Sequence, residues 1–454
     1  MADLLSRGWR PVLRFRSERV RWYTSVASFP PAVPTWSHPP SSAQISDEEI
    51  NRLAARPRRP VTLADLVKHG RPPLSPNALL SSANYTLALL PPRLAHRIQC
   101  LRNLPFIVVS NPHISQIYNN YLHSISTLLP YHKRHITTLQ EEEQFTETMA
   151  DLVHTHNNTI PILARGFLEC RKYITPSEVT KFLEQHLRAR IGTRLIAEQH
   201  IALHMASQPG SYEEKGVSPY IGVIDTALRP AEIIRNCDAF VSEICELKYG
   251  VRPSLILNGE VDAEFAHVPV HLEYIVTELL KNAYRATVES GNERKPVEIT
   301  IAAAPNAPHT KLEALKSLLV SQDTSHDFSQ EGLTEYCNTE GDAIPLNSAA
   351  QSITIRIRDQ GGGIAPDILP NIWAFNFTTF SNNRTSNADN DNIDALNAIS
   401  GSGGGNSSSI AGLGYGLPLG RAYAEYFGGG IAVESLYGFG TDVYLSLQGV
   451  GKIS

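Results

Sequence analysis

The chain has 454 residues, 42% of them hydrophobic, which is enough to fill the cores of two or three domains. A formal net charge of −5 gives no overall basic signal and argues against nucleic acid as a partner. The sequence has no run of about 18 apolar residues that could span a membrane. Its five cysteines form no CxxC pair, so free thiols in a reducing compartment are expected.

The amino-terminal 30 residues carry an excess of arginine, with hydroxyl and aromatic residues between the charges. The arginines are Arg7, Arg10, Arg14, Arg16, Arg19 and Arg21. This composition is typical of a mitochondrial presequence, and Arg21 stands where a matrix protease would cleave to leave Thr24 first. We expect residues 1–23 to be a presequence for the mitochondrial matrix; a basic disordered tail is the alternative. Residues 24–60 are rich in proline, which predicts a disordered leader.

Residues 61–215 show the spacing of amphipathic helices. One apolar stripe consists of Leu152, Ile160, Leu163 and Phe167, and a second of Val179, Leu183, Leu187, Ile191 and Leu195. Long antiparallel helices of this kind pack as a four-helix bundle. Pro209 and Gly210 predict a linker, and from residue 216 to residue 454 helical patterns alternate with short strands, which indicates an α/β sandwich.

The predicted helix ELLKNAYRAT carries two polar side chains one turn apart. Glu278 and Asn282 leave the same face of this helix, while Leu279, Leu280 and Ala283 turn toward a core. A carboxylate beside an amide suits proton abstraction and magnesium coordination. Such a pair on its own is more often a solvated helix face.

Asp359 ends an alternating strand that is followed by three glycines. Ile353, Ile355 and Ile357 share one face of this strand, and residues 361–363 then turn the chain sharply. A carboxylate at the end of a strand, above an opening, is well placed to accept a hydrogen bond from the amino group of adenine.

Gly412, Gly414 and Gly416 form a glycine loop. Because they lack side chains, their backbone N–H groups can approach a polyphosphate, and residues 418–427 predict a helix whose N-terminus adds its dipole. A lone G-x-G-x-G is more often a plain turn. Together with the hairpin GFGTDVYLSL, these motifs in this order indicate one ATP site.

The ordered motifs resemble the GHKL ATPase superfamily, which includes the gyrase and Hsp90 ATPase domains and the histidine kinases. The runs LPPRLAHRIQCLRNLPFI, RARIGTRLIAEQH, ELLKNAYRAT and GTDVYLSL narrow the resemblance, across residues 61–448, to the mitochondrial 2-oxoacid dehydrogenase kinases. Members of that family join an N-terminal four-helix bundle to a GHKL α/β sandwich. They phosphorylate serine on the decarboxylase component of pyruvate or branched-chain 2-oxoacid dehydrogenase.

The resemblance implies a role for each matching residue. Glu278 would be the general base, Asn282 the magnesium ligand and Asp359 the adenine partner. Further ATP-binding residues would be Arg285, Gly361, Gly363, Thr378, Thr379, Gly412, Leu413, Gly414, Tyr415, Gly416, Leu417 and Thr441. The implied cofactors are ATP and Mg²⁺, with K⁺ as a further candidate. The implied partners are the decarboxylase component, the lipoyl-bearing core of the complex and a second copy of the chain.

Two features favour the branched-chain complex as the target, with pyruvate dehydrogenase as the alternative. Tyr274 stands four residues before Glu278, where the pyruvate group usually has histidine, and the chain stops at Ser454 without that group's long tail. His156 aligns with a bundle histidine that faces the nucleotide domain in relatives. A polar residue at the end of the bundle is its other interpretation.

Two segments depart from the family pattern, and two other classes of function stay open. Residues 303–351 and 381–410 have few apolar residues and predict polar surface insertions, the second within the ATP lid. A histidine kinase needs an acidic residue and proline after its phosphoacceptor histidine, and the residues around His200 lack that order. The third class is a non-catalytic ATP-binding module that docks on the lipoyl core, although every catalytic position is filled.

Overall fold

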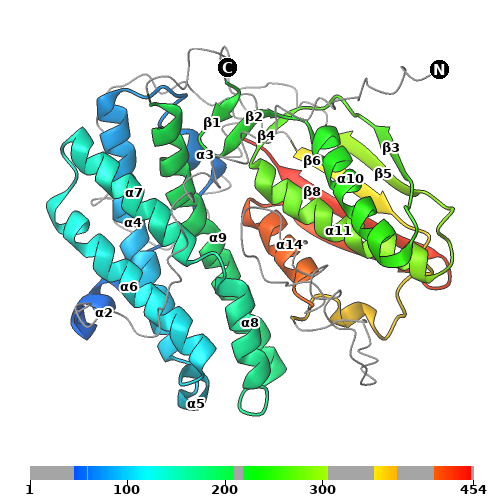
Figure 1. Ribbon diagram of the computed structural model, residues 1–454, viewed down its shortest axis with the longest axis horizontal. Coiled ribbons are helices and arrows are strands. Elements are labelled where there is room, and N and C mark those ends of the chain that lie inside the picture. Colours follow the sequence, from blue (N-terminus) through cyan, green and yellow to red (C-terminus); the bar gives the residue numbers. More distant parts are fainter. Residues whose placement is uncertain (1–44, 59, 209–217, 305–351, 376–413, 451–454) are drawn as a thin grey trace, which may run out of the picture.

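The computed structural model describes residues 45–58, 60–208, 218–304, 352–375 and 414–450. Within these ranges a helical region lies beside a mixed α/β unit (Figure 1), which confirms the predicted fold class. None of the helices in the described ranges is long and apolar enough to cross a membrane. The predicted presequence and nearly all of both polar insertions lie outside the described residues.

Helix α2 (Asp47–Ala54) forms where the proline-rich composition predicted a disordered leader, so that prediction was wrong for this segment. Ser46 caps the helix by accepting a hydrogen bond from the Glu49 N–H, and acidic residues in the first turn suit the helix dipole. Ile50 and Leu53 are fully buried in the core of the bundle. A segment this short gives little local signal, because its stability comes from packing against α4 (Pro76–Arg102).

Four long helices and three shorter ones build the rest of the bundle within the described residues. They are α3 (Leu63–Val67), α4, α5 (Phe106–Val109), α6 (Pro112–Arg134), α7 (Leu139–Thr155), α8 (Thr159–Glu169) and α9 (Pro176–Ala206). Side-chain N-caps at Ser75, Asn111, Thr138 and Thr175 begin the four longest. The predicted stripe from Val179 to Leu195 is buried along α9. The other stripe is also buried, but a break at residues 156–158 divides it between α7 and α8.

A five-stranded mixed sheet, in the order β3-β5-β6-β8-β7, forms the centre of the α/β unit. Its strands are β3 (Leu255–Gly259), β5 (Val297–Ala303), β6 (Ser352–Arg358), β7 (Gly430–Leu436) and β8 (Gly440–Gln448). Strands β3 and β5 are parallel, and the other neighbours are antiparallel. Ile353, Ile355 and Ile357 are buried, as their alternation predicted. Strands β1 (Tyr220–Ile221), β2 (Ile224–Leu228) and β4 (Phe265–His267) form a separate small sheet.

Helix α14 (Gly416–Tyr426) connects the sheet to the bundle. With α10 (Pro230–Tyr249) and α11 (Pro269–Glu289) it covers one face of the sheet, and its other side packs on α9 (Figure 1). The hydroxyl of Tyr426 occupies the space above Gly192 of α9, where a Cβ atom would collide with it. Arg188 of α9 forms an ion pair with Glu425 of α14. The core of the bundle therefore continues into the α/β unit.

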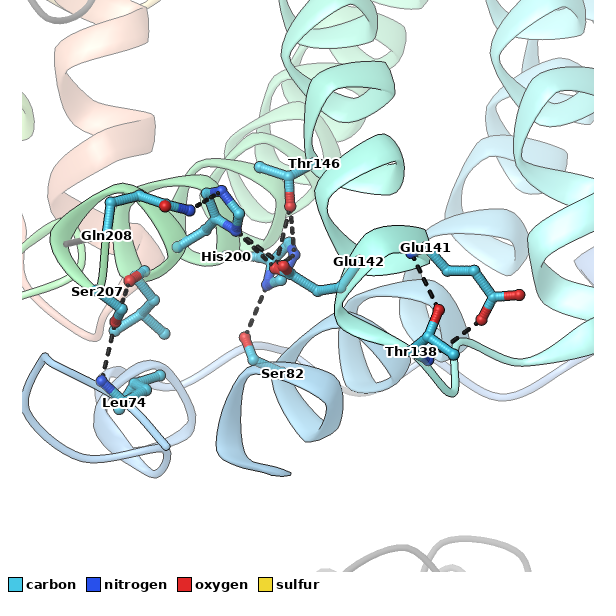
Figure 2. A network of polar contacts seen from close by, with 11 residues as sticks. Leu74, Ser82, Thr138, Glu141, Glu142, Thr146, His200, Ser207 and Gln208 are labelled. Carbon is cyan, nitrogen blue, oxygen red and sulfur yellow. Dashed lines mark hydrogen bonds and ion pairs between the residues drawn. The ribbon is translucent and has the colours of Figure 1, made fainter. Parts of the chain in front are cut away.

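A buried carboxylate ties three bundle helices together (Figure 2). Glu142 of α7 is 1% exposed; it accepts a hydrogen bond from His204 Nδ1 at 2.9 Å and contacts His200 Nε2 at 3.3 Å. Ser82 of α4 and Thr146 hold the two ring nitrogens of His200, each at 3.0 Å. Burial raises the pKa of Glu142, but hydrogen bonds from the two histidines outweigh that effect and hold it at about 2. The carboxylate is therefore ionised at neutral pH.

Glu142→Ala should lower the free energy of unfolding by about 3 kcal/mol at pH 7, because both histidines lose a buried acceptor. The folded-state pKa lies below that of the unfolded chain, so this contribution is complete above about pH 5 and is lost as the pH falls toward 2. Urea denaturation should show the difference from wild type shrinking over that range. Glu143→Ala, an exposed neighbour on α7, is the control and should change stability by less than about 0.5 kcal/mol. Equal losses in the two variants would contradict the role of Glu142.

Candidate functional site

Helix α11 presents Glu278 to the first residue of α14. The Glu278 side chain is 15% exposed, and its Oε1 accepts a hydrogen bond from Lys281 Nζ at 2.8 Å. Its Oε2 lies so close to Gly416 that a Cβ atom there would overlap the carboxylate. The predicted general base is therefore fixed between an ammonium group and the backbone of the glycine loop.

Asn282 and Ala286 continue the face of α11 that begins at Glu278, because each is four residues further along the helix. Ala286 packs on Gly361 so tightly that a Cβ atom on that glycine would overlap it. Asn282 is exposed and lies between these two contacts along the helix. Its amide is thus placed between the glycine loop and the turn that follows β6.

Arg285 and Lys281, two basic residues of α11, make contacts that the sequence analysis did not predict. The resemblance implied that Arg285 binds ATP, whereas its Nε donates to Glu289 Oε1 on the same helix, at 2.9 Å. A nucleotide contact of Arg285 stays a prediction. The motif analysis missed Lys281, although its spacing of three residues from Glu278 placed the two side chains together on a helix.

Asp359 lies at the end of β6 and is 6% exposed. Its Oδ1 accepts hydrogen bonds from the Gly361 N–H at 2.8 Å and the Thr441 N–H at 3.3 Å. Both of these bonds reach Oδ1, so within the described part of the chain Oδ2 is left to accept from a ligand. Burial raises the pKa of Asp359, and the two backbone donors oppose that shift. The structure therefore brings Asp359, the predicted adenine partner, together with Gly361 and Thr441, two further residues predicted to bind ATP.

The glycine loop leads directly into α14. Gly414 has a φ of 73°, in the left-handed region that glycine adopts without strain, and Gly363 in the turn after β6 has a φ of 71°. Tyr415 is fully buried, and α14 begins at Gly416, two residues earlier than predicted, with Leu417 in its first turn. The predicted residues Thr378, Thr379, Gly412 and Leu413 lie outside the described residues.

The described residues fit the ATP and Mg²⁺ that the motifs imply. The buried carboxylate of Asp359 keeps an oxygen for an amino group, and the exposed amide of Asn282 offers the kind of oxygen that Mg²⁺ binds. Helix α14 has no side-chain N-cap, so its first N–H groups can serve a phosphate.

His156 lies inside the bundle, at the end of α7. Its Nε2 is 2.8 Å from Ser124 Oγ, and its ring stacks on Tyr121 with centroids 4.7 Å apart. Burial lowers the pKa of His156 to about 3, so the ring is neutral. Together with Arg190 and Arg194 it lines a cavity of ≈ 60 Å³. A regulatory role for this histidine stays a prediction.

The fold and this arrangement define a GHKL-type ATP-binding domain joined to a helical bundle. Residues 60–225 match the family model described as mitochondrial branched-chain alpha-ketoacid dehydrogenase kinase. Residues 331–450 match the model of histidine kinase-, DNA gyrase B- and HSP90-like ATPases. The chain is 30% identical to mitochondrial pyruvate dehydrogenase (acetyl-transferring) kinase 1 of Saccharomyces cerevisiae over 409 residues, which cover 89% of this chain and 87% of that protein.

Two further relatives are also mitochondrial pyruvate dehydrogenase kinases. The mitochondrial pyruvate dehydrogenase (acetyl-transferring) kinase of Arabidopsis thaliana is 28% identical, with 89% of this chain and 94% of that protein covered. The mitochondrial pyruvate dehydrogenase (acetyl-transferring) kinase of Schizosaccharomyces pombe is 27% identical, with 88% of this chain and 96% of that protein covered. The chain belongs to the mitochondrial 2-oxoacid dehydrogenase kinase family and is a mitochondrial, ATP-binding protein kinase. The names of these relatives do not support the predicted preference for the branched-chain complex.

Asp359→Ala should weaken ATP binding about ten- to a hundredfold, because adenine loses a charged hydrogen-bond acceptor. Asn282→Ala should reduce the difference between affinities measured with and without Mg²⁺. Isothermal titration calorimetry on the folded variants measures both effects. Asp367→Ala is the matched control, since this carboxylate is exposed beyond the turn. Unchanged ATP affinity in both site variants would rule out this placement of the nucleotide.

Proposed function

We propose that this kinase transfers the γ-phosphate of ATP to a serine of the decarboxylase component of pyruvate dehydrogenase in the mitochondrial matrix, and thereby inactivates the complex. The observation that carries this proposal is the position of Glu278, at the junction of α11 and the glycine loop and one helical turn from the exposed Asn282. A carboxylate at the phosphate end of an ATP site can accept the proton of an attacking hydroxyl. The names of the relatives support pyruvate dehydrogenase as the target.

The residues of the site divide the work of phosphoryl transfer, which needs positioning and charge neutralisation more than covalent chemistry. Glu278 would accept the serine proton, and Lys281 fixes its carboxylate. The first N–H groups of α14 would hold the phosphates, and Asp359 would select adenine. Asn282 would hold Mg²⁺, which when bound neutralises phosphate charge.

The branched-chain complex is the second candidate target. Tyr274 lies one turn before Glu278 on α11 and packs on Tyr423 of α14, with ring centroids 5.3 Å apart. Burial raises the pKa of Tyr274 well above its usual range, and the nearby charge of Glu278 adds to this effect. A neutral phenol beside the base therefore replaces the histidine that the pyruvate group usually has. The name of the family model that matches residues 60–225 also favours this candidate.

The partners and cofactors beyond ATP are part of the same proposal. We expect the bundle to dock on the lipoyl-bearing core of the complex, the chain to form a homodimer, and Mg²⁺ to be required, with K⁺ as a further candidate. Tethering to the core would raise the effective concentration of kinase near its target. A non-catalytic module would show the docking without any phosphate transfer.

Glu278→Gln should keep ATP binding and lower the rate of phosphate transfer about 10²-fold or more, because the amide has the same shape but cannot accept the proton. Single-turnover assays with labelled ATP measure the transfer, and calorimetry measures the binding. Glu273→Gln, which changes an exposed carboxylate of α11, should retain wild-type turnover. Near-normal transfer by Glu278→Gln would remove this residue from the role of base.

Incubation with labelled ATP and each purified decarboxylase component identifies the target. We expect an acid-stable phosphate on serine of the pyruvate dehydrogenase component, a fall in its activity, and faster labelling when the lipoyl-bearing core is added. Labelling of the branched-chain component alone would select the second candidate. An acid-labile phosphate would indicate histidine kinase chemistry, and no phosphate would indicate the non-catalytic module.

A further inference from the structure

An ion pair spans the last paired positions of β6 and β8, on the face of the sheet opposite α11. Arg358 and Asp442 stand directly opposite each other in the ladder. Arg358 Nε lies 2.7 Å from Asp442 Oδ1, and Nη2 lies 2.6 Å from Oδ2. A bidentate pair of this kind fixes geometry as well as charge. The Asp442 side chain is only 16% exposed, and Arg358 is the main cation that neutralises it.

The neighbouring residues of the same two strands form the adenine side of the ATP site. Asp359 follows Arg358, Thr441 precedes Asp442, and both are buried. The Asp359 N–H donates to the Thr441 carbonyl at 3.0 Å, and the Thr441 N–H donates back to the Asp359 carboxylate. Ala286 is the residue of α11 that packs on this turn, and its side chain carries no charge. The ion pair is therefore one residue from Asp359 along β6 and one residue from Thr441 along β8.

Four charged residues lie side by side across the sheet at this level, and three of them are acidic. In register across β5, β6, β8 and β7 the row reads Glu298, Arg358, Asp442 and Glu434. The charge of Asp442 adds to burial in raising the pKa of Asp359, and the Arg358 guanidinium lowers the pKa of Asp442. Arg358 is the one cation among these four residues, and the charge of Arg356, two residues earlier on β6, also lowers the pKa of Asp442.

We propose that Arg358 is a positioning residue for the nucleotide: by pairing with Asp442 it offsets the negative charge beside Asp359. Adenine binding requires Asp359 as an ionised acceptor, so a cation behind the strand maintains the form of the site that binds. This inference rests on the proposed function, because it assumes that Asp359 receives adenine. An ordinary cross-strand ion pair would affect stability without changing the pH dependence of nucleotide binding.

The test is calorimetric binding of ADP with Mg²⁺ to the full chain between pH 6 and pH 8. Arg358→Ala should bind more weakly than wild type at pH 6, by at most about tenfold, and within about twofold at pH 8, since a shift of one pKa unit changes the ionised fraction of an acid by at most about tenfold. The sign follows from Asp359: its protonated form accumulates as the pH falls, and loss of Arg358 extends that form to higher pH. The double variant Arg358→Ala/Asp442→Asn should restore the wild-type profile, because it removes the charge that Arg358 offsets.

Two further variants keep the test decisive. Asp442→Asn alone retains the cation and should shift the loss of ADP binding to lower pH, so it reports on the same charge if Arg358→Ala does not fold. Arg229→Ala is the control, because Arg229 forms a comparable ion pair with Glu264, at 2.6 Å, away from the ATP site. It should match wild type at every pH.

The outcomes separate this inference from the proposed function. A wild-type chain that does not bind ADP would overturn both. If wild type binds and Asp359→Ala does not, but Arg358→Ala follows the wild-type pH profile, only the role of Arg358 is overturned. The same holds if Arg358→Ala binds equally weakly at all pH values and the double variant shows no recovery.

Discussion

The ATP site depends on the close approach of one helix to glycine backbone at two places. Glu278 meets the backbone of Gly416, and Ala286 meets Gly361, in both cases with no room for a Cβ atom. These two residues are eight apart on α11, which corresponds to about 12 Å along a helix. The helix therefore fixes the distance between the glycine loop and the turn that follows β6. Asn282 lies midway between these two contacts along the helix.

Much of this site could be predicted because its signals are local. The spacing of Glu278 and Asn282 and the alternation of Ile353 to Ile357 each depend on a few neighbouring residues. The structure places the first two on one helix and buries the three isoleucines, as expected. Residues whose role comes from another strand or from the far side of the sheet were missed. Arg358 and Asp442 are 84 residues apart in the chain, so no local pattern connects them.

The errors in the predicted fold also come from contacts between residues that are distant in the sequence. Helix α2 has a good N-cap, but its two buried residues gain their stability from α4, which local composition does not report. The apolar stripe through residues 152–167 has the correct residues buried, yet the helix breaks at residues 156–158, where His156 turns its ring into the bundle. Periodicity predicts which side chains are buried better than it predicts where a helix ends. Tertiary contacts decide the latter.

The contact between Tyr426 and Gly192 has a consequence for how the protein unfolds. A side chain of the kinase domain rests directly on the backbone of a bundle helix, and the Arg188–Glu425 ion pair lies beside it. Domains joined by a polar linker alone would melt independently, whereas apolar residues of α14, such as Leu419 and Ala422, belong to the core cluster of the bundle and couple the two units. We therefore expect the bundle and the ATP-binding unit to unfold together, so that damage to either one lowers the population of both.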